Sequence, residues 1–149
     1  MSELLIPRRQ LAALIPHAGS MCLLDGVEYW DAEGIRCISW THLRRDNPLR
    51  ADGCLSALHA VEYAAQAMAV HGGLLARAAA HAPRRGYLAG LRDVQLGTDW
   101  LHPLEGPLRV VAVRLAGAAG SFLYRFEVTA QDRLVAAGRV TVIDPGGTP

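Results

Sequence analysis

The middle of the chain holds a long, almost wholly apolar segment, residues 53–70, which reads GCLSALHAVEYAAQAMAV. Its length and composition favour a helix. Asp52 and Gly53 predict a start there, because an Asp side chain can accept hydrogen bonds from the free amides of a first turn. Gly72 and Gly73 predict that the regular helix weakens, after which the chain either continues it or forms a second short helix. The segment therefore predicts one central helix.

Three polar side chains interrupt this apolar helix, at His59, Glu62 and Gln66. At about 100° per residue they fall within roughly 60° of one another and share one stripe. A Glu side chain is almost never fully buried without a partner. We therefore expect Glu62 to serve in a polar network or in chemistry. In the structural alternative, Gln66 satisfies backbone groups of the strands and Glu62 is neutral or bonded to a buried tyrosine.

Strands are expected on both sides of the helix. Alternating or continuous apolar runs bounded by turn residues predict strands at 21–30, 34–40, 86–96, 108–116, 122–130 and 133–143. An apolar helix followed by a strand meander predicts an α+β fold, in which an antiparallel sheet curves around the helix. Because an open sheet has two exposed edges, we expect two protomers to pair into a continuous sheet, with a homodimer as the minimum assembly.

Composition limits the classes of function. The chain has 149 residues, 51% of them apolar and 19% charged, with a formal net charge of +1. This length predicts a single domain, placed at 1–143, with a flexible tail at 144–149. The charge balance gives no general affinity for nucleic acid.

The cellular setting is predicted from what the sequence lacks. Three widely spaced cysteines, with no C-x-x-C pair, argue against a disulfide framework or a zinc site and favour a reducing compartment. The first residues lack the apolar region of a signal peptide, and no apolar stretch reaches the roughly 20 residues of a membrane span. The prediction is a cytoplasmic protein.

His17 is the strongest candidate for an acid/base partner of Glu62. Pro16 fixes the turn before it, and an apolar run begins four residues later at Met21. The other histidines lack such a setting, except His59, which competes from the helix stripe itself. A histidine and a carboxylate together form a possible acid/base pair.

Two segments carry a resemblance to a known family. Residues 14–27, LIPHAGSMCLLDGV, resemble the leucine-proline-histidine segment that opens hot-dog-fold 3-hydroxyacyl-acyl-carrier-protein dehydratases. Residues 62–67, EYAAQA, resemble the Glu-x-x-x-Gln of their central helix. The similarity is closest to the dehydratase-like branch of aryl polyene biosynthesis, which the helix start at Gly53 and the strand at 86–91 also match. The resemblance implies a homodimeric hot-dog fold.

The sequence also departs from the family pattern. Fatty-acid dehydratases of this family carry a catalytic histidine in a His-Phe-Pro-Gly motif before the helix, where this chain has Pro48. The aryl polyene branch lacks that histidine too, which makes His17 its substitute. Leu55 replaces a proline of the branch, and His59 replaces a small residue. Because of these departures, a catalytically altered or inactive member of the family remains an alternative.

The resemblance implies dehydration of a 3-hydroxyacyl thioester, on acyl carrier protein or coenzyme A, to the trans-2-enoyl thioester. His17 would remove the proton next to the thioester carbonyl, and Glu62 would protonate the departing hydroxyl. Amides at Gly53 and Cys54 would stabilise the enolate from the helix N-terminus, with His59 and Gln66 beside the substrate. The two catalytic residues would come from different protomers.

The same resemblance implies a phosphopantetheine arm carried by the substrate and no cofactor of the protein's own. Arg84 and Arg85 would dock the acidic carrier. A hetero-oligomer with another hot-dog or ketosynthase subunit is a further expectation. Two alternatives remain: a hot-dog thioesterase, in which Glu62 or Asp52 activates water or attacks the thioester, and a non-catalytic partner subunit.

Overall fold

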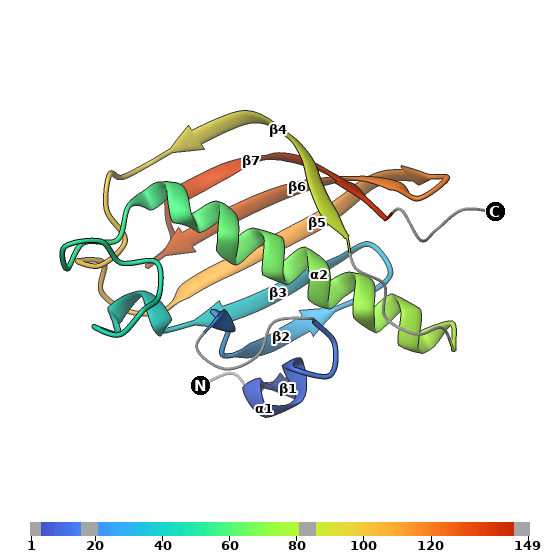
Figure 1. Ribbon diagram of the computed structural model, residues 1–149, viewed down its shortest axis with the longest axis horizontal. Helices are drawn as coiled ribbons and strands as arrows, with labels where there is room; N and C mark the ends of the chain where they lie inside the picture. Colours follow the sequence, from blue (N-terminus) through green and yellow to red (C-terminus); the bar gives the residue numbers. More distant parts are fainter. Residues whose placement is uncertain (1–3, 16–20, 81–85, 145–149) are drawn as a thin grey trace.

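The computed structural model describes residues 4–15, 21–80 and 86–144. Within these ranges one antiparallel sheet of seven strands packs against one long helix, α2 (Ala60–Ala78), which crosses the face of the sheet (Figure 1). The order of the strands across the sheet is β1-β2-β3-β5-β6-β7-β4. The α+β class and the sheet wrapped on a central helix are confirmed.

The remaining elements are short before the helix and long after it. The chain runs through β1 (Ile6–Pro7), α1 (Arg8–Leu11), β2 (Gly26–Trp30) and β3 (Gly34–Ser39), and through short 3-10 helices at Thr41–Leu43 and Ala57–His59. After α2 come β4 (Tyr87–Leu96), β5 (Leu108–Ala118), β6 (Ser121–Ala130) and β7 (Arg133–Ile143). Strands β5, β6 and β7 form the expected meander, and β4 lies beyond β7 at one edge.

The alternating pattern of β6 explains why sequence reasoning located the strands well. Tyr124, Phe126 and Val128 are buried against the core, whereas Arg125 and Glu127 between them are exposed on the outer face. A strand places successive side chains on opposite faces, so this sequence can form the element in only one orientation.

The strand predicted over 21–30 is shorter in the structure, because β2 begins at Gly26. The residues before it leave the sheet because α2 binds their backbone: the amide of Leu23 donates to Gln66 Oε1. Apolar content predicted a strand here, and a side chain of the helix competes for the same backbone groups.

The predicted helix start at Asp52 is also wrong. Asp52 and Gly53 have positive φ angles of 53° and 76° and form a tight turn closed by the Ala51–Cys54 bridge. The helical course begins with the 3-10 turn at Ala57–His59, where Ser56 accepts a hydrogen bond from the Leu58 amide through its side chain. Ser56 is therefore the cap, as expected of a short hydroxyl side chain preceding a helical turn.

Gly72 and Gly73 do not interrupt the helix, because α2 continues to Ala78. Gly73 is buried where the N-terminal segment crosses α2, and a Cβ at this position would lie 2.6 Å from the carbonyl oxygen of Leu14. The neighbouring Gly72 has nothing within 4 Å of its Cβ position. Gly73 therefore allows the chain near Leu14 to lie directly on the helix.

The core lies between α2 and the central strands. The helix buries Tyr63, Ala64, Ala67, Val70 and Leu74, which form one cluster with the inward side chains of β3, β5 and β6. Burial of these apolar side chains is the main force that holds the helix on the sheet. No helix in the described part of the chain is long and apolar enough to cross a membrane.

The covered part of the sheet ends before β4. Every residue of β4 is exposed or only half-buried, including Leu88 and Leu91. These two side chains pair in register with Val142 and Val140 of β7, and Val140 is buried. The inward face of the sheet thus continues onto β4 without the cover that α2 gives the central strands.

We predict opposite effects of adding one methyl group at the two adjacent glycines. Gly73→Ala should lower the free energy of unfolding by about 1–3 kcal/mol, because the new Cβ overlaps the Leu14 carbonyl. Gly72→Ala should raise it by about 0.5–1 kcal/mol, because alanine is the better helix former and the methyl group meets nothing. Urea unfolding of both variants measures this, and equal shifts would contradict the close approach at Gly73.

Candidate active site

A groove with a cavity volume of about 520 Å³ runs along α2. Its helix wall extends from Glu62 to Ala76, with Ala79 just after the end of α2. Its sheet wall includes residues of β4, β6 and β7, among them Leu88, Phe122 and Val142. The volume is in the range of small-molecule sites, and most side chains lining it are apolar. Such a wall accommodates an apolar ligand.

Glu62 lines this groove and is exposed. The expectation of a buried carboxylate is therefore wrong for the single chain: Glu62 lies on the flank of α2 that faces the groove, while Tyr63 next to it enters the core. No described side chain forms a hydrogen bond or an ion pair with Glu62. The carboxylate is consequently available to a ligand in the groove.

Gln66 lines the groove one turn further along, and its amide is engaged with backbone. Its Oε1 accepts from the Leu23 amide at 2.8 Å, and its Nε2 donates to the Met21 carbonyl at 2.6 Å. This is the arrangement that the structural alternative anticipated for Gln66. The two bonds attach the backbone at Met21 and Leu23 to the helix that carries Glu62. Contact between Gln66 and a substrate stays a prediction.

His17 itself lies outside the described residues, as do Arg84 and Arg85. Leu14 and Met21, on either side of the segment that contains His17, both line the groove. The described residues on both sides of residues 16–20 therefore belong to the groove wall.

The other predicted site residues lie apart from the groove. Gly53 and Cys54 belong to the turn before the 3-10 helix, and the Cys54 amide already donates to the Ala51 carbonyl at 3.0 Å. The helix-terminal amides that motivated their predicted role are absent because the helical course starts later. Their contact with substrate stays a prediction without that support. His59 is half-buried at the start of α2 and, like them, is absent from the groove wall.

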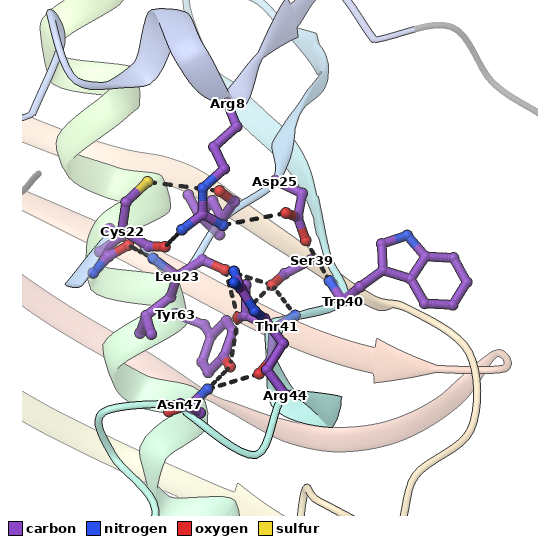
Figure 2. Close-up of polar contacts among 12 residues, drawn as sticks. Arg8, Cys22, Leu23, Asp25, Ser39, Trp40, Thr41, Arg44, Asn47 and Tyr63 are labelled. Atoms are coloured by element: carbon purple, nitrogen blue, oxygen red, sulfur yellow. Dashed lines mark hydrogen bonds and ion pairs between the residues drawn. The ribbon is translucent and has the colours of Figure 1, made fainter. Parts of the chain in front are cut away.

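A buried network that sequence reasoning missed holds the loop before the helix. Tyr63 Oη lies 2.9 Å from Thr41 Oγ1 and accepts from Asn47 Nδ2 at 3.0 Å (Figure 2). Thr41 Oγ1 in turn donates to the Leu23 carbonyl. Burial raises the pKa of the Tyr63 hydroxyl. The phenol therefore stays protonated, and the network holds Asn47 in place without offering a titrating group near neutral pH.

His71 is a further buried polar group of α2, and no sequence pattern singled it out. Its Nδ1 lies 2.7 Å from Tyr124 Oη, and its Nε2 lies 2.8 Å from the Asp31 carbonyl. A carbonyl only accepts, so Nε2 carries the hydrogen and Nδ1 accepts from the phenol. Burial lowers the pKa of His71, against the opposing effect of its bond to Asp31. The imidazole is therefore held neutral.

This neutral histidine predicts a loss of stability in acid. In the unfolded chain His71 regains a pKa near 6.5, so the unfolded state binds its proton first as the pH falls. The contribution of His71 to the free energy of unfolding is complete above about pH 6.5. Below that pH it is lost, by at most about 1.4 kcal/mol per pH unit. His71→Gln should reduce the slope of unfolding free energy between about pH 7 and pH 5.

Urea unfolding across this pH range measures the slope in both proteins. Burial also lowers the pKa of His42, which is present in both and serves as the common background. Identical slopes would contradict the assignment to His71.

The strand order and central helix place the chain in the hot-dog fold class, and solved structures share it. The dehydratase heterocomplex ApeI:P from Xenorhabdus doucetiae aligns with a TM-score of 0.81 and 23% identity, over 91% of this chain and 90% of that one. A hypothetical thioesterase with coenzyme A from Streptococcus pneumoniae aligns with a TM-score of 0.58 and 11% identity, over 83% of this chain and 87% of that one. Thioesterase HI1161 from Haemophilus influenzae aligns with a TM-score of 0.53 and 10% identity, over 79% of this chain and 76% of that one. At these identities the similarity shows the fold.

The family is shown by the sequence itself. Residues 9–148 match the family model described as ApeP-like, ApeP dehydratase. The chain belongs to this dehydratase family, as the resemblance at residues 14–27 and 62–67 predicted. No curated protein is significantly similar to the sequence.

Proposed function

We propose that this dehydratase removes water from a 3-hydroxyacyl thioester on acyl carrier protein and leaves the trans-2-enoyl thioester. The observation that carries the proposal is the carboxylate of Glu62 in the wall of an otherwise largely apolar groove. The family match to a dehydratase supports the reaction type. The groove supports a substrate with a long apolar part.

The two proposed catalytic groups divide the proton transfers. His17 takes the proton from the carbon next to the thioester carbonyl, and electrons move through the enolate to form the new double bond. Glu62 donates a proton to the 3-hydroxyl, and the carbon–oxygen bond breaks with release of water. An imidazole suits the first role because it accepts protons near neutral pH. Leu14 and Met21 lie in the same groove wall as Glu62 of their own chain, which supports a pairing of His17 with that Glu62. A pairing across two protomers stays a prediction.

The substrate supplies the remaining chemistry. We propose that it arrives on a phosphopantetheine arm and that the protein uses no cofactor of its own. The acidic carrier would dock through Arg84 and Arg85, whose positive charges steer an acidic partner to the site. Aryl polyene synthesis is the proposed pathway class, supported by the family to which the chain belongs. Three cysteines without a disulfide, Cys22, Cys37 and Cys54, support a reducing, cytoplasmic setting.

The exposed edge strand β4 supports pairing with a second hot-dog protomer. Its inward side chains Leu88 and Leu91 are 45% and 47% exposed, although they continue the face that is buried on β7. An uncovered apolar edge strand offers free backbone groups for pairing. We propose that another hot-dog protomer covers it, either a second copy of this chain or a related subunit. The ApeI:P structure, a dehydratase heterocomplex, supports the second form.

We predict that loss of water depends on both proposed residues. Mass spectrometry of a 3-hydroxyacyl carrier protein should show loss of one water with the wild type, in the assembly in which it is purified. His17→Ala and Glu62→Gln should each slow the reaction at least about 100-fold, as removal of a general acid or base does.

The control for this experiment is Glu127→Gln, the same change at an exposed carboxylate on the outer face of β6. It should keep the wild-type rate. Release of free carrier thiol without an enoyl product would identify a thioesterase instead. Carrier binding without turnover, unchanged by either substitution, would identify a non-catalytic subunit.

We predict that the assembly depends on β4. Leu91→Lys should convert the protein to the 16.0 kDa single chain in sedimentation, because it places a charge where a partner would bury an apolar side chain. Leu115→Lys changes a leucine of similar exposure, 44%, on β5 and should leave the assembly intact. Equal effects of the two substitutions, or none, would contradict pairing through β4.

A further inference from the structure

The groove contains a positively charged group whose presence the dehydration chemistry does not explain. Arg114 of β5 lines the groove together with Phe122 and Tyr124 of β6. Its guanidinium carbon lies 4.1 Å from the centre of the Phe122 ring, and its Nε and Nη2 donate to Tyr124 Oη at 3.2 and 3.0 Å. The cation is therefore held at a fixed place in an apolar wall.

The supports of Arg114 are themselves fixed by buried groups. Tyr124 Oη donates to His71 Nδ1 at 2.7 Å, and His71 Nε2 is bonded to the Asp31 carbonyl. Tyr124 is 2% exposed and His71 is fully buried. Because neutral His71 accepts the hydrogen bond donated by the phenol, the lone pairs of the phenol oxygen are free to accept hydrogen bonds from Arg114. The chain of bonds from α2 thus orients the guanidinium toward one position.

The guanidinium retains donors for a ligand. A guanidinium has five N–H donors, and among the described residues its contacts are Tyr124 Oη and the rings of Phe122 and Tyr124. No carboxylate of the described residues forms an ion pair with it. Its free N–H groups match an oxygen atom of a bound molecule, and most strongly an ionised one.

Arg114 lies well away from the proposed reaction centre. His71, which its partner Tyr124 contacts, follows Glu62 by roughly two and a half helical turns, about 13 Å along the axis of α2. The groove continues past this level to Ala79. A thioester carbonyl near Glu62 would therefore leave the far part of the acyl chain beside Arg114.

We propose that Arg114 selects acyl chains that carry an oxygen acceptor far from the thioester. The shared chemistry is a hydrogen-bond-accepting oxygen, provided by a carboxylate or by a hydroxyl group on the chain. Asp144 also lines the groove, and its negative charge repels a carboxylate more than a neutral hydroxyl group. Comparing the two oxygen groups therefore shows which one the site favours. This inference rests on the proposed function, because that function places the thioester near Glu62 and so sets the direction of the acyl chain in the groove.

The test measures binding, so it does not depend on turnover. Stable amide analogues of acyl-pantetheine, equal in chain length and ending in a methyl, a hydroxyl or a carboxylate group, are titrated calorimetrically into the intact protein, in the assembly in which it is purified. At least one oxygen-ended ligand should bind about tenfold or more tightly than the methyl-ended one. The two oxygen-ended ligands show whether the selected group is charged.

Arg114→Gln should abolish this preference, and Arg114→Lys should retain part of it for the carboxylate alone, because lysine lacks the planar fork. The matched control is Arg125→Gln, the same substitution at an exposed arginine on the opposite face of β6. It should keep the wild-type preference. Should Arg114→Gln not fold, the Arg114 Nε–H signal of the wild type gives the same answer by nuclear magnetic resonance, since only an oxygen-ended ligand should shift it.

Equal affinity for all three ligands, no binding of any of them, or a preference unchanged in Arg114→Gln would overturn the inference. The proposed dehydration is measured separately, by the loss of water. A protein that shows the Arg114-dependent preference without releasing water keeps this inference and loses the proposed reaction. Water loss without the preference keeps the proposed reaction and overturns the role of Arg114.

Discussion

Burial of one face of α2 against the sheet is the constraint on which the rest of the structure depends. Tyr63, Ala67 and Val70 enter the core, and the angular spacing of a helix then places Glu62 on its flank. Because α2 covers the central strands and stops short of β4, the inward face of the sheet stays open along that flank. The groove and its carboxylate follow from this single packing arrangement.

Three polar side chains make this packing specific. Tyr63 bonds Thr41 and Asn47, Gln66 bonds the backbone of Met21 and Leu23, and His71 bonds Tyr124 and Asp31. Apolar burial alone has little directional preference, whereas a buried polar group left without its partner costs about 1–3 kcal/mol. The helix is thereby joined to the loop before it, to the N-terminal segment and to the sheet. One helix thus orients both the reaction centre and the far end of the groove.

Sequence reasoning succeeded where a local pattern decides the outcome. The alternation in β6 set that strand, and the Glu62 and Gln66 spacing led to the groove flank of the helix. It failed at the helix start, because Asp52 is as good a cap as Ser56 and only the course of the turn at Gly53 distinguishes them. It also assumed a buried Glu62, because the apolar composition of the helix does not show which of its side chains the sheet covers.

The amino-acid sequence by itself determined the fold class, the family and the candidate carboxylate, because periodicity and motif spacing are properties of neighbours along the chain. The tertiary structure alone decided that Gln66 anchors the N-terminal segment, and that buried His71 meets Tyr124, which holds Arg114 in the groove wall. These residues come from α2, β6 and β5, and no local pattern relates them. Their contacts arise from strand register and helix placement, which depend on packing across the whole domain.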